Sequence, residues 1–204
     1  MSILGNLFII SAPSGAGKTT LVNAVVQDLQ DLQVSVSYTT RPKRPLEQDG
    51  LNYHFVSREK FQEMIQKSDF LEFAEVFNNY YGTSKTWVDA QLKQGLDVIL
   101  EIDWQGAEQL RRLMSCVSIF IIPPNIDTLL SRLQHRNQDS PKVIEERVQG
   151  AKIEIGHYAE YDYLICNDHF ERAYDDLKAI IIAERLKIEK QGLRQQAILR
   201  ELLS

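Results

Sequence analysis

Residues 7–20 read LFIISAPSGAGKTT, an apolar run, a short segment with two glycines, then a lysine and two threonines. The apolar part, residues 7–12, is typical of a strand that is buried on both faces of a parallel sheet. The segment that follows places Leu21 and Val25 at helical spacing, which predicts a helix over residues 18–32. The stretch therefore predicts a strand, a loop and a helix, and it raises the question of whether the loop is only a tight turn or binds phosphate.

Similar runs recur along the chain. Residues 97–103, 117–122 and 161–167 are further strands of the buried type, helical stretches lie between them, and a helix over residues 173–190 follows the last. Strands that alternate with helices favour a parallel sheet with helices on both faces. The predicted fold class is α/β.

Two regions interrupt this alternation. Residues 34–84 are rich in aromatic and β-branched residues and are punctuated by RPKRPLEQDG, which predicts a small mixed β/α insert with antiparallel strands. Residues 126–157 are polar and arginine-rich, with the breaker NQDSP in their middle, which predicts a mobile hairpin of two helices. The tail, residues 192–204, is predicted to be a short amphipathic helix, either a packed end or a contact in a homo-oligomer. The core is expected to comprise residues 1–33, 85–125 and 158–204.

Composition limits the class of protein. The chain has 204 residues, 44% of them hydrophobic, which suffices for one sizeable core. The net charge of −5 and the short basic runs argue against nucleic acid as a partner. No apolar stretch is long enough for a membrane span, and the N-terminus lacks the basic start of a signal peptide. With only Cys116 and Cys166, expected to be buried free thiols, we expect a cytoplasmic protein without a membrane partner.

The glycine-rich loop approximates the phosphate-loop pattern G-x-x-x-x-G-K-[ST]. Residues 12–19 read APSGAGKT, so Ala12 replaces the first glycine of the pattern. The strand before the loop and the helix after it are the context that such a loop requires. Gly15 and Gly17 allow the backbone to aim several N–H groups inward, and the start of the helix favours an anion.

Two side chains decide between a turn and a phosphate site. Lys18 would place a charge on the β- and γ-phosphates, and the Thr19 hydroxyl would ligate Mg²⁺. A glycine turn without a ligand needs neither residue, so we expect phosphate binding. A kinase that phosphorylates another phosphate needs no general base, since the acceptor oxygen is already ionised, but it needs a second cationic site to bring two anions together.

A second anion site is predicted in the insert. Arg41 and Arg44 are three residues apart and separated by proline, and the arginine fork suits phosphate. Tyr53 and Tyr81 offer hydroxyl groups that would complete such a site. The alternatives are a solvated loop for the arginines and a half-buried sheet position for each tyrosine.

A base-reading carboxylate is predicted on the strand around DFLEFAEVF. An ionised carboxylate only accepts hydrogen bonds, and guanine presents two adjacent donors where adenine presents an acceptor. Glu72 in a walled pocket would therefore select guanine, with Glu75 as the rival candidate. Ser37 and Thr83 are short hydroxyl residues that would reach guanine or the carboxylate.

Five segments together resemble one known family, the guanylate kinases: SAPSGAGKTTL, SVSYTTRPKRPLEQDGLNYHFV, FLEFAEVFNNYYGT, DVILEIDWQGA and YDYLICND. The resemblance runs from about residue 5 to residue 190, and Ala12 is a common variant in that family. It implies a P-loop nucleoside monophosphate kinase fold with a GMP-binding insert at residues 34–84 and a lid at residues 126–157. The implied reaction is Mg²⁺-dependent transfer of the γ-phosphoryl group of ATP to GMP, and also to dGMP, within purine nucleotide metabolism.

The same resemblance implies roles for individual residues. ATP is expected to bind the loop and an asparagine beside the adenine, namely Ala12, Pro13, Ser14, Gly15, Ala16, Gly17, Lys18, Thr19, Thr20 and Asn167. GMP is expected to bind Ser37, Arg41, Arg44, Tyr53, Glu72, Tyr81, Thr83, Glu101 and Asp103. The expected catalytic cations are Lys18, Arg41, Arg132, Arg136 and Arg147, of which the last three belong to the lid and close over the transferring phosphate. Thr19 is the expected magnesium ligand, and Asp103 contacts either the water shell of Mg²⁺ or GMP itself.

Two other readings stay open. Some guanylate-kinase-like domains are protein-binding scaffolds, although they usually lack phosphate-loop and catalytic residues that this chain keeps, such as Lys18. The second alternative is a kinase that phosphorylates another nucleoside monophosphate, although Glu72 argues against a pyrimidine base.

Overall fold

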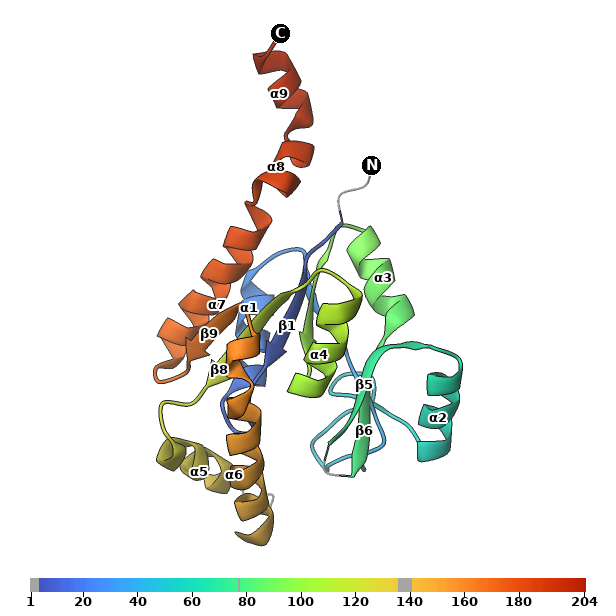
Figure 1. Cartoon of the computed structure of the whole chain (residues 1–204), viewed down its shortest axis with the longest axis vertical. Coiled ribbons are helices and arrows are strands. Elements are labelled where there is room, and N and C mark those ends of the chain that lie inside the picture. The colour runs from blue at the N-terminus through green and yellow to red at the C-terminus, as the bar shows by residue number, and fades with distance from the viewer. Residues whose placement is uncertain (1–3, 77, 136–140) are drawn as a thin grey trace.

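A parallel five-stranded sheet forms the centre of the molecule (Figure 1). The computed structural model describes residues 4–76, 78–135 and 141–204. Within them the strand order of this sheet is β2-β7-β1-β8-β9, and all pairings are parallel. The strands are β1 (Leu7–Ser11), β2 (Leu32–Val34), β7 (Asp97–Glu101), β8 (Val117–Ile122) and β9 (Tyr163–Cys166). The predicted α/β class and the parallel sheet are confirmed.

Helices cover both faces of this sheet because alternate strand residues point to opposite sides. Phe8 and Ile10 of β1 lie in one buried cluster with side chains of α1 (Lys18–Asp28) and α7 (Phe170–Arg185). Leu7 and Ile9 lie in a second cluster with α3 (Lys85–Lys93) and α4 (Trp104–Leu113). The run LFII is thus apolar throughout because each face has its own core.

The insert forms a second sheet with the order β4-β3-β6-β5. Its strands are β3 (Tyr38–Thr39), β4 (His54–Phe55), β5 (Phe70–Val76) and β6 (Asn79–Ser84), and α2 (Arg58–Gln66) packs on it. Phe61, Met64 and Phe70 make a small core of its own. The pairs β3–β6 and β5–β6 are antiparallel, as expected, but β3 and β4 pair in parallel, so the expectation of purely antiparallel strands is wrong for that pair.

Two helices form the expected hairpin beyond β8. They are α5 (Ile126–His135) and α6 (Pro141–Gly156), and Leu129, Leu133 and Ala151 pack between them. The short 3₁₀ helix η1 (Tyr158–Glu160) connects α6 to β9. Figure 1 shows this hairpin and the second sheet at the same end of the molecule.

Two expectations about helix length are wrong. The first helix ends at Asp28 rather than at residue 32, because Asp31 takes a φ of 58° and Leu32–Val34 then pairs with β7. Val34, where the insert was expected to begin, therefore belongs to the central sheet. The helix expected over residues 173–190 is broken after Arg185, and the carbonyl of Arg185 is satisfied by the side-chain amide of Gln191 at 2.9 Å instead.

The chain ends in α8 (Ile188–Arg194) and α9 (Gln196–Leu202), which project away from the sheet (Figure 1). The predicted tail helix is α9. Cys116 and Cys166 are free thiols, but neither is buried: Cys116 is half-buried and Cys166 is exposed. Across the described residues, every helix is too short or too polar to span a membrane.

Candidate active site

The glycine-rich loop curls tightly between β1 and α1. Gly15 and Gly17 both have a φ of 93°, and the N–H of Ala16 donates to the carbonyl of Pro13 at 3.0 Å. Gly17 is the N-cap of α1, so the loop ends on a helix N-terminus whose first N–H groups lack helical partners. This conformation supplies the backbone donors and the positive helix end that suit phosphate groups.

Lys18 and Thr19 begin α1 beside the end of strand β7. The pairing of β1 with β7 aligns Ile10 with Glu101, which brings Glu101 next to the loop. The Thr19 hydroxyl donates to Glu101 Oε2 at 2.7 Å, and Lys18 Nζ lies 3.9 Å from the same oxygen. The Lys18 side chain is 20% exposed.

Asn167 closes the opposite side of the loop. It is buried, and its Nδ2 donates to the carbonyl of Ala16 at 2.7 Å. Arg132 of α5 donates from Nη2 to the carbonyl of Asn167 at 3.0 Å and from Nη1 to the carbonyl of Ala16 at 3.4 Å. A pocket of about 390 Å³ opens here, lined by Gly15, Gly17, Thr20, Ser131, Arg132, Asn167 and Phe170.

The hairpin of α5 and α6 carries the three arginines that were expected to close over the phosphates. Arg132 reaches the phosphate loop as described, and Arg147 lies half-buried on α6. Arg136 falls outside the described residues. Arg132 thus brings a cation of the hairpin into contact with the loop.

Glu72 is a buried carboxylate in the second sheet. Its side chain is 4% exposed, and the Thr83 hydroxyl on the neighbouring strand donates to its Oε1 at 2.6 Å. Burial raises the pKa of Glu72 to about 7, the hydrogen bond from Thr83 opposes that rise, and the charge of Asp103 adds to it. A carboxylate so enclosed favours a ligand that brings two hydrogen-bond donors.

Glu75, the rival candidate, lies on the other side of β5. It is exposed and pairs with Arg58 on α2 at 3.6 Å. Successive residues of a strand alternate faces, so positions 72 and 75 cannot both face the same pocket. Burial distinguishes the two, and Glu72 is the buried one.

The two predicted arginines lie in the loop before β4. Arg41 has its guanidinium carbon 5.4 Å from the ring centre of Tyr53, and Tyr53 lies 5.9 Å from Tyr81, centre to centre. Burial raises the pKa of Tyr53 to about 12, with contributions from Tyr81 and Glu101, so its phenol is a protonated donor at neutral pH. Arg44 is half-buried and makes no ion pair within the described part of the chain.

The helix α4 joins the insert to the central sheet. Asp103 caps it by accepting from the N–H of Gly106 at 3.0 Å, and its other oxygen accepts from Gln105 at 3.0 Å. A Cβ built on Gly106 would lie only 2.4 Å from Glu72 Oε2, so the buried carboxylate sits directly on the first turn of α4. Ser37 is half-buried just before β3, and its carbonyl accepts from the N–H of His54 at 2.9 Å.

Two carboxylates in this region were not predicted as site residues. Glu154 on α6 is partly buried, and burial raises its pKa to about 7, while the charge of Lys18 opposes that rise and the charge of Asp103 adds to it. Glu47 accepts hydrogen bonds from Arg41 at 2.6 Å and from the N–H of Arg44 at 2.8 Å. The available signal for Glu47 was an acid close in sequence to Arg41 and Arg44, and Glu154 had none beyond its place on α6.

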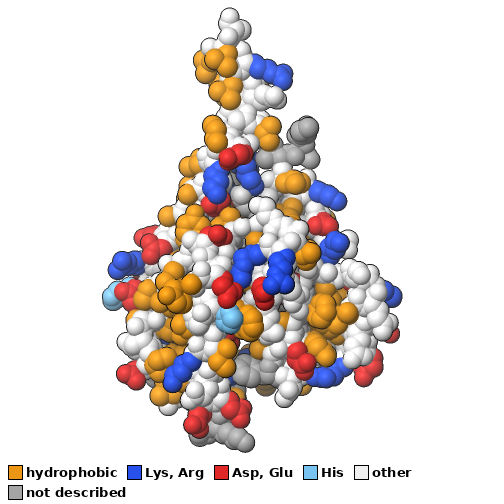
Figure 2. All heavy atoms as spheres, in the orientation of Figure 1, with side chains coloured by type: hydrophobic (Ala, Val, Ile, Leu, Met, Phe, Trp, Pro, Cys, Tyr) orange, Lys and Arg blue, Asp and Glu red, His pale blue; other side chains and the backbone are white. Residues whose placement is uncertain are grey.

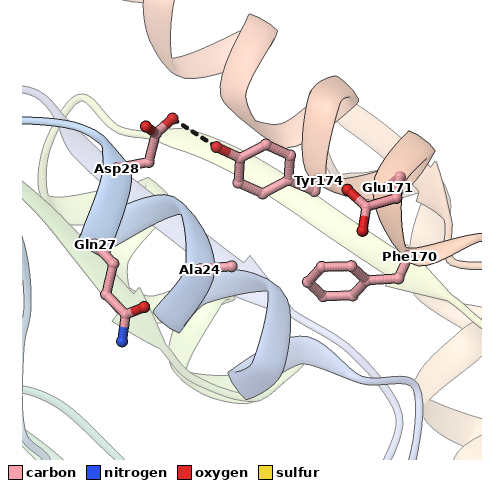
Figure 3. A pocket seen from close by; sticks show the side chains of 6 residues that line it. All are labelled: Ala24, Gln27, Asp28, Phe170, Glu171 and Tyr174. Atoms are coloured by element: carbon pink, nitrogen blue, oxygen red, sulfur yellow. Dashed lines mark hydrogen bonds between the residues drawn. The ribbon is translucent and has the colours of Figure 1, made fainter.

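A second hollow lies between α1 and α7 (Figure 3). It measures about 460 Å³ and is lined by Ala24, Gln27, Asp28, Phe170, Glu171 and Tyr174. The Tyr174 hydroxyl donates to Asp28 at 2.5 Å, and Lys178 pairs with the same carboxylate at 2.6 Å. Two acidic side chains, Asp28 and Glu171, line this hollow and would repel phosphate. None of the predicted site residues lines it.

The chain resembles known guanylate kinases over nearly its whole length. The family described as guanylate kinase matches residues 5–184. Guanylate kinase of Hahella chejuensis is 56% identical over 201 residues, covering 98% of this chain and 97% of that protein, and guanylate kinase of Vibrio parahaemolyticus is 53% identical over 203 residues, covering 98% of each. The crystal structure of guanylate kinase from Anaplasma phagocytophilum superposes with a TM-score of 0.80 at 33% identity, covering 96% of this chain and 94% of that one. The chain belongs to the guanylate kinase family and is a nucleoside monophosphate kinase that transfers a phosphoryl group from ATP to GMP.

Proposed function

We propose that two anion sites, joined through residues 101–106, carry out this transfer. Glu101 contacts Thr19 beside the phosphate loop, and five residues later Gly106 contacts Glu72 of the insert. This continuity is the observation that carries the proposal, because a transfer between two nucleotides requires two binding sites held in a fixed relation.

The donor site holds ATP. Residues 12–20 supply backbone donors and the helix N-terminus for the phosphates, Lys18 supplies a charge, and Asn167 borders the adenine in the pocket beside Arg132. Arg132, Arg147 and Arg136 close over the phosphates from the lid. Closure excludes water, which limits hydrolysis of ATP.

The acceptor site holds GMP. Glu72 accepts from the N1–H and the exocyclic amine of guanine, with Thr83 holding the carboxylate and Ser37 nearby. Arg41, Arg44, Tyr53 and Tyr81 bind its phosphate. The acceptor oxygen is already ionised, so the chain needs no general base and contributes position and positive charge. dGMP fits the same site.

Magnesium fits the residues at the donor site. The Thr19 hydroxyl, Glu101 and Asp103 are hard oxygen donors of the kind that Mg²⁺ binds, directly or through water. Mg²⁺ usually takes the rest of its ligands from nucleotide phosphates and water, and when bound it would neutralise charge on the transferring group. We propose a cytoplasmic enzyme that converts GMP to GDP within purine nucleotide metabolism.

An ADP-release assay with ATP, Mg²⁺ and GMP tests the donor site. Lys18→Ala is expected to lower kcat by roughly two to three orders of magnitude, as the loss of one charge-stabilising group does in other enzymes. Lys93→Ala, which removes an exposed lysine of α3, is the matched control and keeps wild-type kcat. Equal kcat for both variants would contradict the donor-site assignment.

A further inference from the structure

Glu47 places a negative charge beside the arginines that bind the GMP phosphate. Its side chain is 15% exposed, and both of its oxygens are occupied. Oε1 accepts from Arg41 Nη2 at 2.6 Å, and Oε2 accepts from the backbone N–H of Arg44 at 2.8 Å. An anion at this position repels a phosphate, so its presence needs a compensating role.

Glu47 fixes the shape of the loop that carries both arginines. The N–H of Glu47 donates to the carbonyl of Arg44 at 3.1 Å, and the bond from the N–H of Arg44 to the Glu47 carboxylate runs in the opposite direction. These two bonds close a four-residue turn in a segment, residues 40–53, that lies between β3 and β4 and outside regular helix and strand. The turn therefore depends on side-chain contacts for its conformation.

Glu47 also fixes the guanidinium group of Arg41. Arg41 Nη1 donates to the carbonyl of Pro42 at 2.9 Å, and the rings of Tyr53 and Phe55 lie 5.4 Å and 5.7 Å from its guanidinium carbon. Of the five N–H groups of an arginine, two are used, and three have no partner among the described residues. Those three suffice for a bidentate bond to phosphate while Glu47 keeps its own.

The charge state of Glu47 agrees with this arrangement. Burial alone would raise the pKa of Glu47, but the hydrogen bonds from Arg41 and Arg44 outweigh it and lower that pKa below its ordinary value. Glu47 is therefore ionised at neutral pH, and its bond to Arg41 is charge-assisted.

We propose that Glu47 is a positioning residue: it holds Arg41 and the turn at Arg44 in the geometry that receives the phosphate of GMP, without contacting the nucleotide. The inference rests on the proposed binding of that phosphate by Arg41 and Arg44. An arginine held in place beforehand loses less conformational freedom on binding, so the preorganisation raises affinity.

Binding of GMP and of guanosine, measured by calorimetry without ATP, tests this role. Guanosine has the base but no phosphate, so it reports on the Glu72 pocket alone. Glu47→Ala is expected to weaken GMP binding roughly tenfold or more and to leave guanosine within about twofold, because only the phosphate contacts are lost. Glu47→Gln keeps a hydrogen-bond acceptor for the N–H of Arg44 but lacks the negative charge. Its affinity for GMP should lie between that of Glu47→Ala and that of the wild type.

Asp49→Asn is the matched control. Asp49 lies in the same loop, and its Oδ1 accepts from the N–H of Phe55 at 2.8 Å, a bond that asparagine keeps. This variant removes a nearby negative charge without touching Arg41, and wild-type affinity for both ligands is expected. In steady-state assays Glu47→Ala should raise KM for GMP, leave KM for ATP unchanged and change kcat less.

Three results would overturn the inference. If Glu47→Ala binds GMP as tightly as the wild type or more tightly, Glu47 is a spectator or a competitor for Arg41. If GMP and guanosine weaken equally, the site has merely lost its structure. Arg41→Ala distinguishes the phosphate site from the positioning role. Unchanged GMP affinity in Arg41→Ala would rule out the proposed phosphate site itself. Weaker GMP binding in Arg41→Ala, with wild-type binding in Glu47→Ala, would rule out only the positioning role.

Discussion

At the scale of single residues, the recognition of guanine that we propose for Glu72 comes with a cost in the stability of the free protein. Its carboxyl group is buried with one hydroxyl partner, Thr83, and its pKa of about 7 lies well above the ordinary value of 4.5. Guanine would supply the donors that the free protein lacks. Recognition of the base and stability of the empty protein therefore place opposite demands on this side chain.

The pH dependence of stability follows from that pKa. A carboxyl group whose pKa is higher in the folded state than in the unfolded state adds to the free energy of unfolding at low pH. This contribution is fully present below pH 4.5 and is lost as the pH rises through about 7. The difference between 4.5 and about 7 corresponds to roughly 3 kcal/mol. Glu72→Gln removes this ionisable group, so its free energy of unfolding relative to the wild type should be higher at pH 8 than at pH 5. The difference between the two pH values should reach up to about 3 kcal/mol.

Urea unfolding at pH 5 and pH 8 measures this difference. Glu75→Gln is the matched control, since Glu75 is exposed on the same strand, and it should show a similar small effect at both pH values. A Glu72→Gln effect that is equal at pH 5 and pH 8 would show that burial does not raise the pKa of Glu72.

Gly17 is required both by its backbone angle and by its neighbour. Its φ is 93°, and a Cβ would lie 2.4 Å from Asn167 Nδ2, which holds the carbonyl of Ala16. Gly17→Ala should therefore raise KM for ATP roughly tenfold or more, because it displaces Asn167 and strains the loop by about 1–2 kcal/mol.

Gly50→Ala is the control that distinguishes backbone strain from displacement of a neighbouring side chain. Gly50 has a φ of 76°, and a Cβ there would meet open space within the described chain. It should lose stability on the order of 1 kcal/mol in urea unfolding while KM for ATP stays at the wild-type value. Similar KM values for Gly17→Ala and Gly50→Ala would exclude a role for Asn167 in the loop.

At the scale of elements, α4 connects Glu72 of the second sheet to the segment that follows α6. Its first residue, Trp104, stacks on His157, which follows α6, with 3.8 Å between ring centres and 6° between planes. Further along α4, Arg111 pairs with Glu160 at 3.0 Å. These contacts hold the C-terminal end of α6 against α4. Arg147 and Glu154 lie on α6, and Asp103 caps α4.

Removal of this stack should affect turnover through the lid. An aromatic pair contributes about 1 kcal/mol, so Trp104→Ala is expected to lower kcat by up to about tenfold while guanosine affinity stays unchanged. Trp104→Phe keeps a ring on His157 and should retain most of kcat in the same steady-state assay. Equal kcat for the alanine and phenylalanine variants would show that the ring contact is irrelevant to turnover.

The sequence predicted elements where local pattern and packing agree. The strand at Leu7–Ser11, the loop and α1 were predictable because an all-apolar run followed by glycines and a helical period has few other solutions. β2 was missed because its three residues form a strand only through pairing with β7. The parallel pairing of β3 with β4 was missed because each strand has two residues, and the loop between them decides their direction.

The candidate site shows the same division. Gly15, Gly17, Lys18 and Glu72 could be proposed from the sequence because residues of these types in this pattern suit phosphate or guanine, and their roles stay predictions. Glu47 and Glu154 were missed because an acid near a phosphate site has meaning only when its partners are placed by the fold. The resemblance to guanylate kinases supplied the residue roles that local pattern alone left open.

At the scale of the whole molecule, the proposed nucleotide sites and the C-terminal tail lie in different parts of the fold. Figure 1 shows α8 and α9 at the opposite end of the molecule from the lid and the second sheet. Figure 2 shows apolar side chains on this projecting segment, where Leu193, Ile198, Leu199 and Leu202 are exposed. Residues 193–204 are exposed throughout, so the tail contributes little to the core.

Deletion of residues 196–204 should therefore leave kcat and both KM values unchanged. The deleted residues lie outside the nucleotide pocket and the guanine site, and α9 contacts mainly α8. Steady-state kinetics and thermal unfolding of the shortened chain check this expectation. A fall in kcat at an unchanged unfolding temperature would mean that the tail acts on the site.

The most direct test of base recognition by Glu72 compares kcat/KM for GMP and AMP in the wild type, Glu72→Gln and Glu75→Gln. A site built to hydrogen-bond its ligand rejects an analogue without those groups by roughly 10⁴-fold, so the wild type should prefer GMP by about that factor. Glu72→Gln should lower kcat/KM for GMP by about 10²-fold and narrow the preference, whereas Glu75→Gln should match the wild type. Full discrimination between GMP and AMP in Glu72→Gln would contradict the claim that this buried carboxylate reads the base.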